Sequence, residues 1–498
     1  MRALAIALVL VTAGCGGKRQ VGPAGPPAVA AAFPAARWIP GNPTYVVAAK
    51  TMRDAQRAFR DLVDTFGMVV GAETGEIATM LTQMLAVDPM SAEAVAAIGI
   101  DLDGGMALFS EDVNPTFVVH VSSREALQVF FDRQRERGLI TQSVIVEGSE
   151  IFSAKLDAQL KLSWTVADDW LWVHFTIGTQ DDGTAWFTAS RHPGTPAWGD
   201  KWDAAQKLAT RAPGLVGIVA LRELAAKLAT RAPEAAACAR QLEAVNGVGV
   251  AIEAEGNFVG GRVAVDLGSA ALRLAQHVLA PPPGWATASA KAPLSAQWNI
   301  DLRVVAEWVQ PCVARMQDDG TGPRPADVPN LAAMLDEYGV RSGRAFAHSI
   351  DPDDNSGVGV VALDLTHPRY FASLLGQIPM RSKFEKTRQF GAYKGKHLSV
   401  PFVATADYVL DDRVFIAAMG DGQLQRAATG APAAPPPAFA IDLLPPGLSV
   451  GVWTWLFTEA DLPNPKRLAQ RLQTWNDIHF SAQIDRERLV IDAQGNRR

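Results

Sequence analysis

The chain has 498 residues, 46 basic against 52 acidic side chains, a formal net charge of −6, and 48% hydrophobic residues. This apolar content excludes a chain that is disordered throughout, and a prior of roughly 150 residues per domain predicts about three domains. The mild acidic excess argues against nucleic-acid binding as the main role, and three cysteines exclude a disulfide-dense scaffold and an all-cysteine zinc site.

The amino end carries a short apolar run. Arg2 precedes the run Ala3–Val11, and small residues follow up to Cys15. At about 1.5 Å per residue the run is too short to cross roughly 30 Å of hydrocarbon, but it is typical of the central region of a signal peptide. Residues 1–14 are therefore predicted to be a removed signal peptide, with an ordinary secretory cleavage site nearby as one alternative.

The junction Thr12-Ala13-Gly14-Cys15 resembles the lipobox of bacterial lipoproteins, with Thr12 standing where that family usually has Leu. The resemblance implies that Cys15 carries diacylglycerol and a further acyl chain such as palmitate, and that it becomes the first mature residue. Gly16 after this cysteine implies, from the sorting pattern of enteric bacteria, an outer-membrane lipoprotein of the cell envelope that faces the periplasm. Several acyl chains anchor a protein firmly, because each buried methylene contributes about 0.8 kcal/mol.

Residues 15–36 are predicted to be the lipidated cysteine and a flexible tether, because Gly, Pro and Ala dominate the segment. No later segment offers the roughly 20 consecutive apolar residues of a membrane helix. The rest of the chain is therefore expected in the periplasm or outside the cell.

The mature chain repeats itself in the order of its predicted elements. Three pairs of segments match, and they begin at Ile98 and Tyr338, at Val144 and Phe390, and at Ala212 and Leu444. The first pair contains a Gly turn, a strand, an acidic loop, a second strand and a capped helix. Self-similarity of this extent predicts two tandem copies of one unit.

The predicted domains follow from this internal repeat. They are a first copy at 37–283 with a subdomain break near 200–212, the main part of a second copy at 284–430, a Pro/Ala linker at 431–439, and a closing part at 440–498. This layout resembles that of bacterial lipoproteins with duplicated periplasmic domains, and the resemblance implies no activity.

Each copy is predicted to be α+β, with an antiparallel or mixed sheet and helices on one face. In the first copy, Phe117, Val119 and Val121 alternate with other residues as in a strand. A capping box from Ser122 to Glu125 then begins a predicted helix. The apolar residues at helical spacing in that segment are Leu127, Phe130 and Phe131.

A G-x-S-x-G motif centred on Ser449 fits the nucleophile turn of α/β-hydrolases, and Asp461 and His479 follow in the matching order. That turn needs a strand before the serine and a helix after it, because the geometry exposes the hydroxyl. Pro445-Pro446 precede the motif, and the alternating run Val450–Leu456 predicts a strand after it. Ser449 is therefore expected in a strand-entry turn and not in a catalytic centre.

Two other motifs are expected to be structural. Gly357–Ala362 matches a dinucleotide fingerprint, but its glycines lie in a predicted strand and not before a helix. Asp351–Asn355 places oxygen ligands as a calcium loop does, but Ser356 and Ala362 stand where Gly and Glu are needed. No pair among the eight histidines has the i, i+4 spacing of helical metal ligands, so no metal and no cofactor are predicted.

The pairs Asp168-Asp169 and Asp411-Asp412 are predicted at matching turns, where Asp favours local hydrogen bonds to the backbone. His120 is expected to be a partly exposed strand residue whose counterpart in the second copy is Asp364. The two copies therefore share no chemistry at that position.

Cys238 and Cys312 are the thiols that remain once Cys15 is modified. Oxidising surroundings would let them form a disulfide between the copies. Two separately buried thiols are the alternative, because free cysteine is among the most buried residue types.

Tryptophan is enriched, with 13 residues. Trp170 and Trp172, and likewise Trp453 and Trp455, lie two apart on predicted strands and so share a face. If helices cover that face, these side chains belong to the core. An open face would instead be an aromatic binding surface for glycans, peptides or lipid tails.

Taken together, the patterns predict a lipid-anchored cell-envelope protein of binding or scaffolding type, without a recognisable catalytic site. The expected partners are the membrane, through the anchor, and a protein or apolar ligand, but not nucleic acid. One alternative is a carrier of a lipid or other apolar ligand in a cavity between the copies. Another is a hydrolase whose active-site residues converge only in three dimensions.

Overall fold

The computed structural model divides the chain into two compact units, Met1–Leu267 and Gly268–Arg498. The described residues are 29–62, 79, 82, 86–136, 141–156, 160–177, 183–231, 245–278, 292–301, 303–304, 331–352, 354, 356–378, 381–400, 404–429, 437–459 and 464–498. The boundary falls before the predicted one at 283, because α11 (Ser269–Gln276) contacts β19 (Trp475–Asp485) of the second unit. Val278 also forms a β-bridge with Ile300 of that unit.

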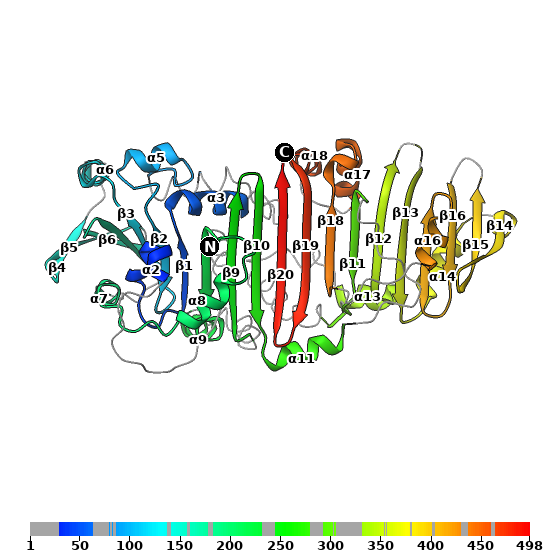
Figure 1. The fold of residues 1–498 in the computed structure, drawn as a ribbon, viewed down its shortest axis with the longest axis horizontal. Coiled ribbons are helices and arrows are strands. Elements are labelled where there is room, and N and C mark those ends of the chain that lie inside the picture. Colours follow the sequence, from blue (N-terminus) through cyan, green and yellow to red (C-terminus); the bar gives the residue numbers. More distant parts are fainter. Residues whose placement is uncertain are drawn as a thin grey trace. The chain divides into compact units, whose positions relative to one another are not determined.

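The first unit holds ten described strands that pair in the order β4-β5-β6-β7-β3-β2-β1-β8-β9-β10 (Figure 1). The strands are β1 (Tyr45–Ala49), β2 (Met106–Ser110), β3 (Thr116–His120), β4 (Gln142–Val146), β5 (Ser149–Lys155), β6 (Leu160–Ala167), β7 (Trp170–Ile177), β8 (Leu215–Val219), β9 (Gly247–Glu255) and β10 (Phe258–Asp266). Every one of these pairings is antiparallel.

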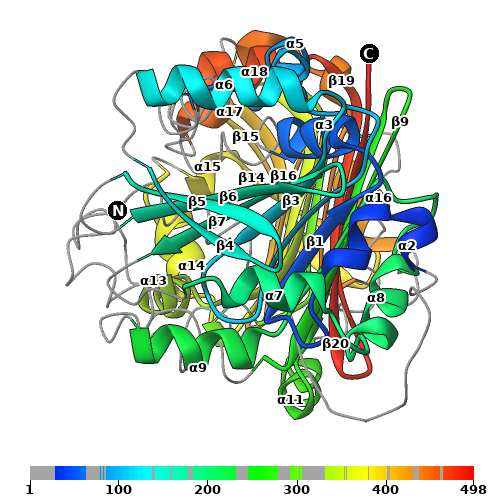
Figure 2. The ribbon, with the colours of Figure 1, turned by 90° about the vertical axis from the view of Figure 1, so that its left-hand side faces the viewer.

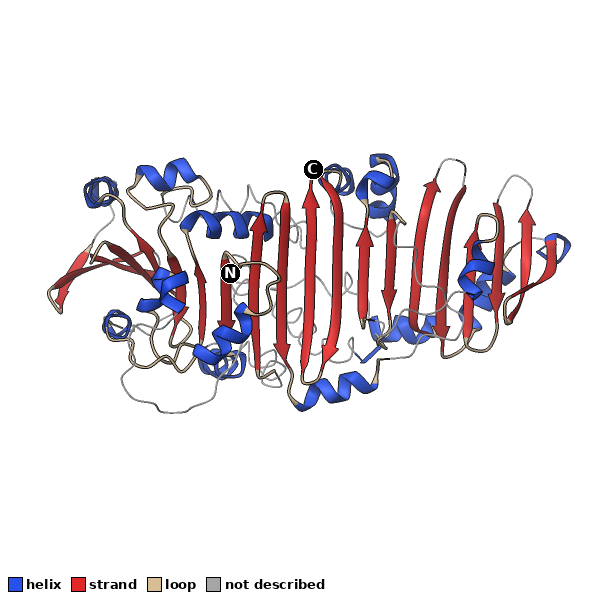
Figure 3. Cartoon of the chain, viewed as in Figure 1, coloured by secondary structure: helices blue, strands red, loops and turns tan. Residues whose placement is uncertain are grey.

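The second unit also holds ten described strands, and they pair in the order β14-β15-β16-β17-β13-β12-β11-β18-β19-β20. The strands are β11 (Leu294–Trp298), β12 (Val340–Asp351), β13 (Ser356–Leu365), β14 (Glu385–Phe390), β15 (Tyr393–Val400), β16 (Ala404–Leu410), β17 (Val414–Met419), β18 (Phe439–Leu443), β19 and β20 (Arg488–Arg497). When β1 is matched with β11, and so on to β10 with β20, the two orders are the same. The predicted α+β class with antiparallel pairing is confirmed (Figure 3).

Helices cover both faces of the first unit's sheet, so the prediction of helices on one face is wrong. Trp170 and Trp172 of β7 pack in one hydrophobic cluster, whereas Leu171 between them packs in another. The first cluster includes η1 (Pro34–Trp38), α7 (Ala185–Arg191) and α8 (Gly199–Gln206), and the second includes α3 (Met52–Leu62), α5 (Ala92–Ala97) and α6 (Arg124–Glu136). Both faces are covered because central strands such as β1, with the sequence YVVAA, are apolar at every position.

Figure 2 shows how these helices flank the first unit. Helices α5 and α6 lie at the upper side of the view, whereas α7 and α9 (Leu221–Arg231) lie at the lower side, with the strands between them. The short helix α2 (Val29–Ala32) precedes η1 at the start of the described chain.

Helices also cover both faces of the second unit's sheet. In β17, Val414 and Ile416 pack in one cluster and Phe415 packs in another. The first of these includes α16 (Gln423–Thr429), and the second includes α13 (Leu331–Tyr338), α14 (Arg369–Gly376) and α15 (Arg381–Phe384). A third cluster joins α17 (Val450–Glu459) and α18 (Pro465–Leu472) to residues of β11, β18 and β19.

Some predicted elements are confirmed closely. The strand predicted around Phe117 is β3, and the helix after it is α6. The helix cap lies one residue later than predicted, because the Ser123 hydroxyl accepts a hydrogen bond from the Ala126 amide at 3.2 Å. The Ser122 hydroxyl instead donates to the Gly99 carbonyl at 3.1 Å.

The third sequence match is wrong in detail. The sequence match aligned β8 with the segment after Leu444. In the structure β8 pairs with β1, and the strand that pairs with the equivalent β11 is β18, which ends at Leu443. The segment after Leu444 forms η5 (Pro445–Gly447) and then α17, so the predicted strand Val450–Leu456 is helical. An apolar run of this length is compatible with a buried helix as well as with a strand.

The predicted subdomain break near 200–212 stays a prediction, and the two units are the divisions that the structure gives. Helix α8 packs on β8 and β9, and its Trp202 is fully buried against Phe33, with ring centroids 5.2 Å apart. Within the predicted linker 431–439, residues 431–436 lie outside the described chain, and Phe439 already belongs to β18.

Candidate functional site

The aromatic face predicted at Trp170 and Trp172 is closed. The two side chains share one face of β7, as predicted, but their residues are only 3% and 0% exposed. The indole N–H of Trp172 donates to the Ser190 hydroxyl at 2.9 Å, and its ring meets that of Trp38 at 5.0 Å. These tryptophans are core residues, so the hypothesis of an open binding surface is wrong here.

Trp453 and Trp455 lie on helix α17 and do not share a face. Residues two apart on a helix are separated by about 200° around its axis. Trp453 is accordingly 2% exposed, with its indole N–H donating to the Pro445 carbonyl at 3.1 Å, whereas Trp455 is 40% exposed. The predicted arrangement, with both tryptophans on one face of a strand, is therefore not found.

Ser449 acts as the cap of that helix. Its hydroxyl accepts a hydrogen bond from the Val452 amide at 3.2 Å, as a capping residue does. A strand and a helix do flank the motif, contrary to the prediction, but η5 separates β18 from the serine. His479 pairs with Asp442 at 2.6 Å, and Asp461 lies outside the described residues.

The remaining motifs lie where the sequence predicts. Gly357 and Gly359 are inside β13. In the loop before it, the Asp354 amide donates to the Asp351 carboxylate at 3.3 Å, whereas Asp353 and Asn355 lie outside the described residues. In the part of the chain that is described, no group of three His, Cys, Asp or Glu side chains could hold a metal ion.

The two aspartate pairs both occupy hairpin turns. Asp168 and Asp169 have positive φ values of 46° and 62° in the turn between β6 and β7. Their carboxylates bind the guanidinium groups of Arg191 and Arg124. Asp411, between β16 and β17, instead accepts hydrogen bonds from backbone amides that follow it in the turn.

Four imidazole–carboxylate pairs occur among the described residues. They are His120–Asp101 at 2.9 Å, His192–Glu147 at 3.1 Å, His397–Asp407 at 2.7 Å and His479–Asp442 at 2.6 Å. In the last two pairs, the histidine and the aspartate lie directly opposite each other on paired strands. Cross-strand side-chain pairs of this kind stabilise a sheet. A catalytic triad needs a hydroxyl or thiol nucleophile bonded to the imidazole, and the described residues give none of these four rings such a partner.

Two glycines establish which positions of the units correspond. Gly99 and Gly339 have φ values of +88° and +69°. The residue after Gly99, Ile100, pairs with Val121, and the residue after Gly339, Val340, pairs with Leu365. The Gly99 carbonyl accepts from the Ser122 amide at 2.8 Å, and the Gly339 carbonyl accepts from the Thr366 amide at 2.7 Å. Asp101 therefore corresponds to Arg341, and His120 to Asp364.

In the first unit, Asp101 is held as a carboxylate. Burial opposes its ionisation, but hydrogen bonds from His120 and from the amides of Asp103 and Gly104 lower the pKa of Asp101 below its usual value. The His120 ring lies edge-on to Trp170 at 5.1 Å, and the Arg37 guanidinium lies 5.2 Å from the same indole.

In the second unit, the corresponding site has its carboxylate at the position of His120 and an arginine at the position of Asp101. Asp364 lies 3.3 Å from the Arg341 guanidinium and 3.6 Å from that of Arg413. Burial raises the pKa of Asp364, although both arginines act against this. Arg303 binds the nearby Asp301 at 2.5 and 2.9 Å, and, although burial opposes it, this contact lowers the pKa of Asp301.

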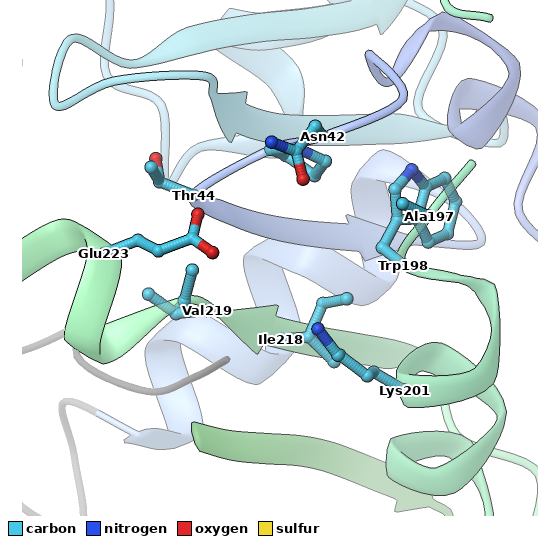
Figure 4. Close-up of a pocket in the computed structure, with 10 residues that line it drawn as sticks. Asn42, Thr44, Ala197, Trp198, Lys201, Ile218, Val219 and Glu223 are labelled. Atoms are coloured by element: carbon cyan, nitrogen blue, oxygen red, sulfur yellow. The ribbon is translucent and has the colours of Figure 1, made fainter. Parts of the chain in front are cut away.

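The first unit contains a small hollow. It is lined by the chain before β1, the start of α8, the end of β8 and Glu223 of α9 (Figure 4). It encloses about 20 Å³, which is room for about one water molecule. A ligand site of the usual size for small molecules is several hundred Å³, so this hollow is not one.

The sequence reasoning missed the most charged surface of the second unit. Hairpin β14–β15 and the preceding α15 carry six basic side chains between residues 381 and 396, with Glu385 as the only acidic one in that span. The density of Lys and Arg is visible in the sequence. Their exposure depends on the strand register, which the sequence pattern did not give.

The remaining predicted site residues lie outside the described chain. These are the lipidation site Cys15 and the two thiols Cys238 and Cys312. Within the described residues, no helix combines the length and apolar character needed to cross a bilayer.

No family model and no curated protein matches the sequence. Solved structures of a protein named TP0453 are similar in part. Its crystal form III aligns with a TM-score of 0.27 and 7% identity over 47% of this chain and 79% of that chain. Crystal form IV aligns with a TM-score of 0.27 and 8% identity over 46% and 79%. A likeness at this level carries no argument about function.

Proposed function

We propose that the chain is a lipid-anchored protein of the bacterial cell envelope that works by binding or scaffolding. Its body is built from two copies of one α+β unit, and Cys15 holds that body to the outer membrane on the periplasmic side. The lipobox resemblance supports the anchor. The identical strand orders of the two units support the duplication.

The observation that carries the binding role is the difference in polar groups at equivalent positions. Asp101 and His120 in one unit correspond to Arg341 and Asp364 in the other. A catalytic centre made of these groups is therefore not shared by the two copies. The strand order is retained while these groups differ, and this favours surfaces that bind different partners.

The hydrolase alternative has one observation in its favour, namely the four imidazole–carboxylate pairs. A fluorophosphonate probe tests it, because the probe reacts with a serine that such a pair activates. Labelling that is lost in His120→Ala, His192→Ala, His397→Ala or His479→Ala would replace binding by catalysis. The carrier alternative, with an apolar ligand between the copies, stays a prediction.

The anchor is tested by metabolic labelling. The full chain is expressed in a bacterium supplied with radiolabelled palmitate, and the membrane fraction is separated and counted. We expect label in the wild type and none in Cys15→Ala, with the label retained by Cys238→Ala as the matched control. Mass spectrometry of the mature amino end should give an acylated Cys15 as the first residue.

Label that persists in Cys15→Ala would place the acyl chain elsewhere. A wild-type chain without label, cut at another site, would show an ordinary secretory protein. Either result removes the proposed anchor.

A further inference from the structure

The most concentrated charge in the second unit lies at one edge of its sheet. Strand β14 is the edge strand among those described, and β15 pairs with it along its length. Residues 381–396 carry six basic side chains against one acidic side chain, in a chain whose net charge is −6. The six are Arg381, Lys383, Lys386, Arg388, Lys394 and Lys396.

Most of this positive charge is not neutralised. Glu385 binds Arg381 at 2.8 Å and also accepts a hydrogen bond from the Tyr408 hydroxyl. No acidic side chain among the described residues pairs with the exposed groups Lys383, Lys386, Arg388 and Lys394. The Lys396 ammonium donates to the Thr387 hydroxyl at 3.1 Å, which leaves its charge in place.

The basic groups surround the hairpin and do not converge on a point. Lys386 and Arg388 are two residues apart and therefore share one face of β14. Their partners on β15 are His397 and Gly395. Lys394 and Lys396 lie on the other face. A single small anion would need donors that point at one place, and groups on both faces of a hairpin do not provide that. Long basic side chains on both faces can reach one extended anionic surface when the free edge at β14 meets that surface.

The fold itself does not require these charges. The equivalent hairpin of the first unit, β4–β5, has two acidic residues, Glu147 and Glu150, and one basic residue, Lys155. Charges on an edge strand protect it from pairing with other chains, and two on β14 would suffice for that. Lys394 and Lys396 are on the inner strand β15, so edge protection does not account for them.

We propose that hairpin β14–β15 binds the anionic headgroups of a phospholipid bilayer. A strand platform for nucleic acid would need exposed aromatic rings on which bases stack. Phe390 of this hairpin is only 5% exposed, and Tyr393 is partly buried against the same hydrophobic cluster. Combined with acyl chains at Cys15, the hairpin would give a second membrane contact, and only this combination rests on the proposed function. Binding of the hairpin to lipid stands without it.

The test uses the mature chain, residues 15–498, with Cys15→Ala so that no acyl chain contributes. The chain is sedimented with vesicles of phosphatidylcholine alone or with about 30% phosphatidylglycerol, which imitates an anionic leaflet. We expect binding to the anionic vesicles only, with a loss of binding as NaCl rises from about 50 mM to about 500 mM, because salt screens the attraction.

The decisive variant is Lys386→Gln/Arg388→Gln/Lys394→Gln/Lys396→Gln. Each basic residue near an anionic surface raises the partition constant about fivefold, so the variant should bind at least tenfold more weakly. The matched control, Arg133→Gln/Lys155→Gln/Lys207→Gln/Lys466→Gln, removes the same charge from exposed positions elsewhere and should bind as the wild type does. Thermal melting of both variants confirms that they are folded.

Equal losses in both variants would show a general effect of net charge and overturn the proposal. Equal binding to both kinds of vesicle, or tighter binding to single-stranded DNA than to anionic vesicles at the same salt, would do the same. Palmitate labelling at Cys15 without vesicle binding by the unlipidated chain removes the hairpin contact and leaves the anchor. Vesicle binding without labelling leaves the hairpin contact and removes the anchor.

Discussion

In the first unit, the imidazole Nδ1 of His120 lies 2.9 Å from a carboxylate oxygen of Asp101. The same two positions hold Asp364 and Arg341 in the second unit, so the carboxylate stands at the position of the histidine and a guanidinium stands at the position of the first unit's carboxylate. Each unit therefore keeps a contact between these two positions, with the carboxylate on the opposite member.

This relationship predicts the outcome of transferring the second unit's pair to the first. Asp101→Arg sets two cationic groups against each other at low pH, and His120→Asp sets two carboxylates together. We expect each single variant to lose stability and Asp101→Arg/His120→Asp to recover part of it, with a coupling energy of about 0.5–1 kcal/mol for such half-exposed pairs. Urea unfolding of the four proteins gives the coupling energy. Losses that simply add would mean that the positions do not interact.

The two tryptophans of α17 provide a matched comparison on one helix. Trp453→Ala removes a side chain that is 2% exposed and should lower the free energy of unfolding by about 3–5 kcal/mol. Trp455→Ala removes one that is 40% exposed and should cost less than about 1 kcal/mol. Chemical denaturation measures both. Similar losses of stability in the two variants would contradict the helix and favour the strand predicted for Val450–Leu456, in which both indoles share a face.

The course of α17 shows where the sequence pattern reaches its limit. The run VGVWTWLF is apolar at nearly every position. Such a run fits a buried strand and equally a helix with a broad apolar surface. Ser449 was the available helix signal, because a serine before an apolar run is a good cap. In α6 the period of 3.6 residues was clear, and there the helix was predicted correctly.

The charged site was less predictable than the elements that carry it. Arg341 and Asp364 come from β12 and β13, and their contact depends on a register that has two irregularities. The sequence did identify Asp364 as the counterpart of His120, because the Gly turns and Asp turns on either side could be aligned. It could not identify the partners, because these lie on neighbouring strands and not along the chain.

Gly99 is expected to be intolerant of any side chain. Its φ of +88° disfavours other residues, and a Cβ there would lie 2.2 Å from the Ser123 carbonyl oxygen. Gly148, with φ of +78° and open space around it, serves as the control that measures the backbone strain alone. Gly148→Ala should cost about 1–2 kcal/mol, and Gly99→Ala clearly more, in thermal or urea unfolding. Equal costs would mean that the close approach at Gly99 relaxes freely.

His479 should make the stability of the second unit depend on pH. Its hydrogen bond with Asp442, against the effect of burial and with help from the charges of Asp442 and Asp492, raises the pKa of His479 above the usual value of about 6.5. Because the folded state holds the proton more tightly, the pair's contribution is complete below the unfolded pKa. It is lost as the pH rises through the folded pKa.

The melting temperature of His479→Gln should therefore fall further below that of the wild type at about pH 5.5 than at about pH 8.5. His348→Gln is the control, since His348 contacts the Phe346 ring and, in the described part of the chain, no carboxylate. NMR titration of the His479 ring gives the raised pKa directly. A difference in melting temperature that stays constant or grows with pH would contradict the role of the Asp442 contact, because only a bond to the protonated imidazole weakens as the proton is lost.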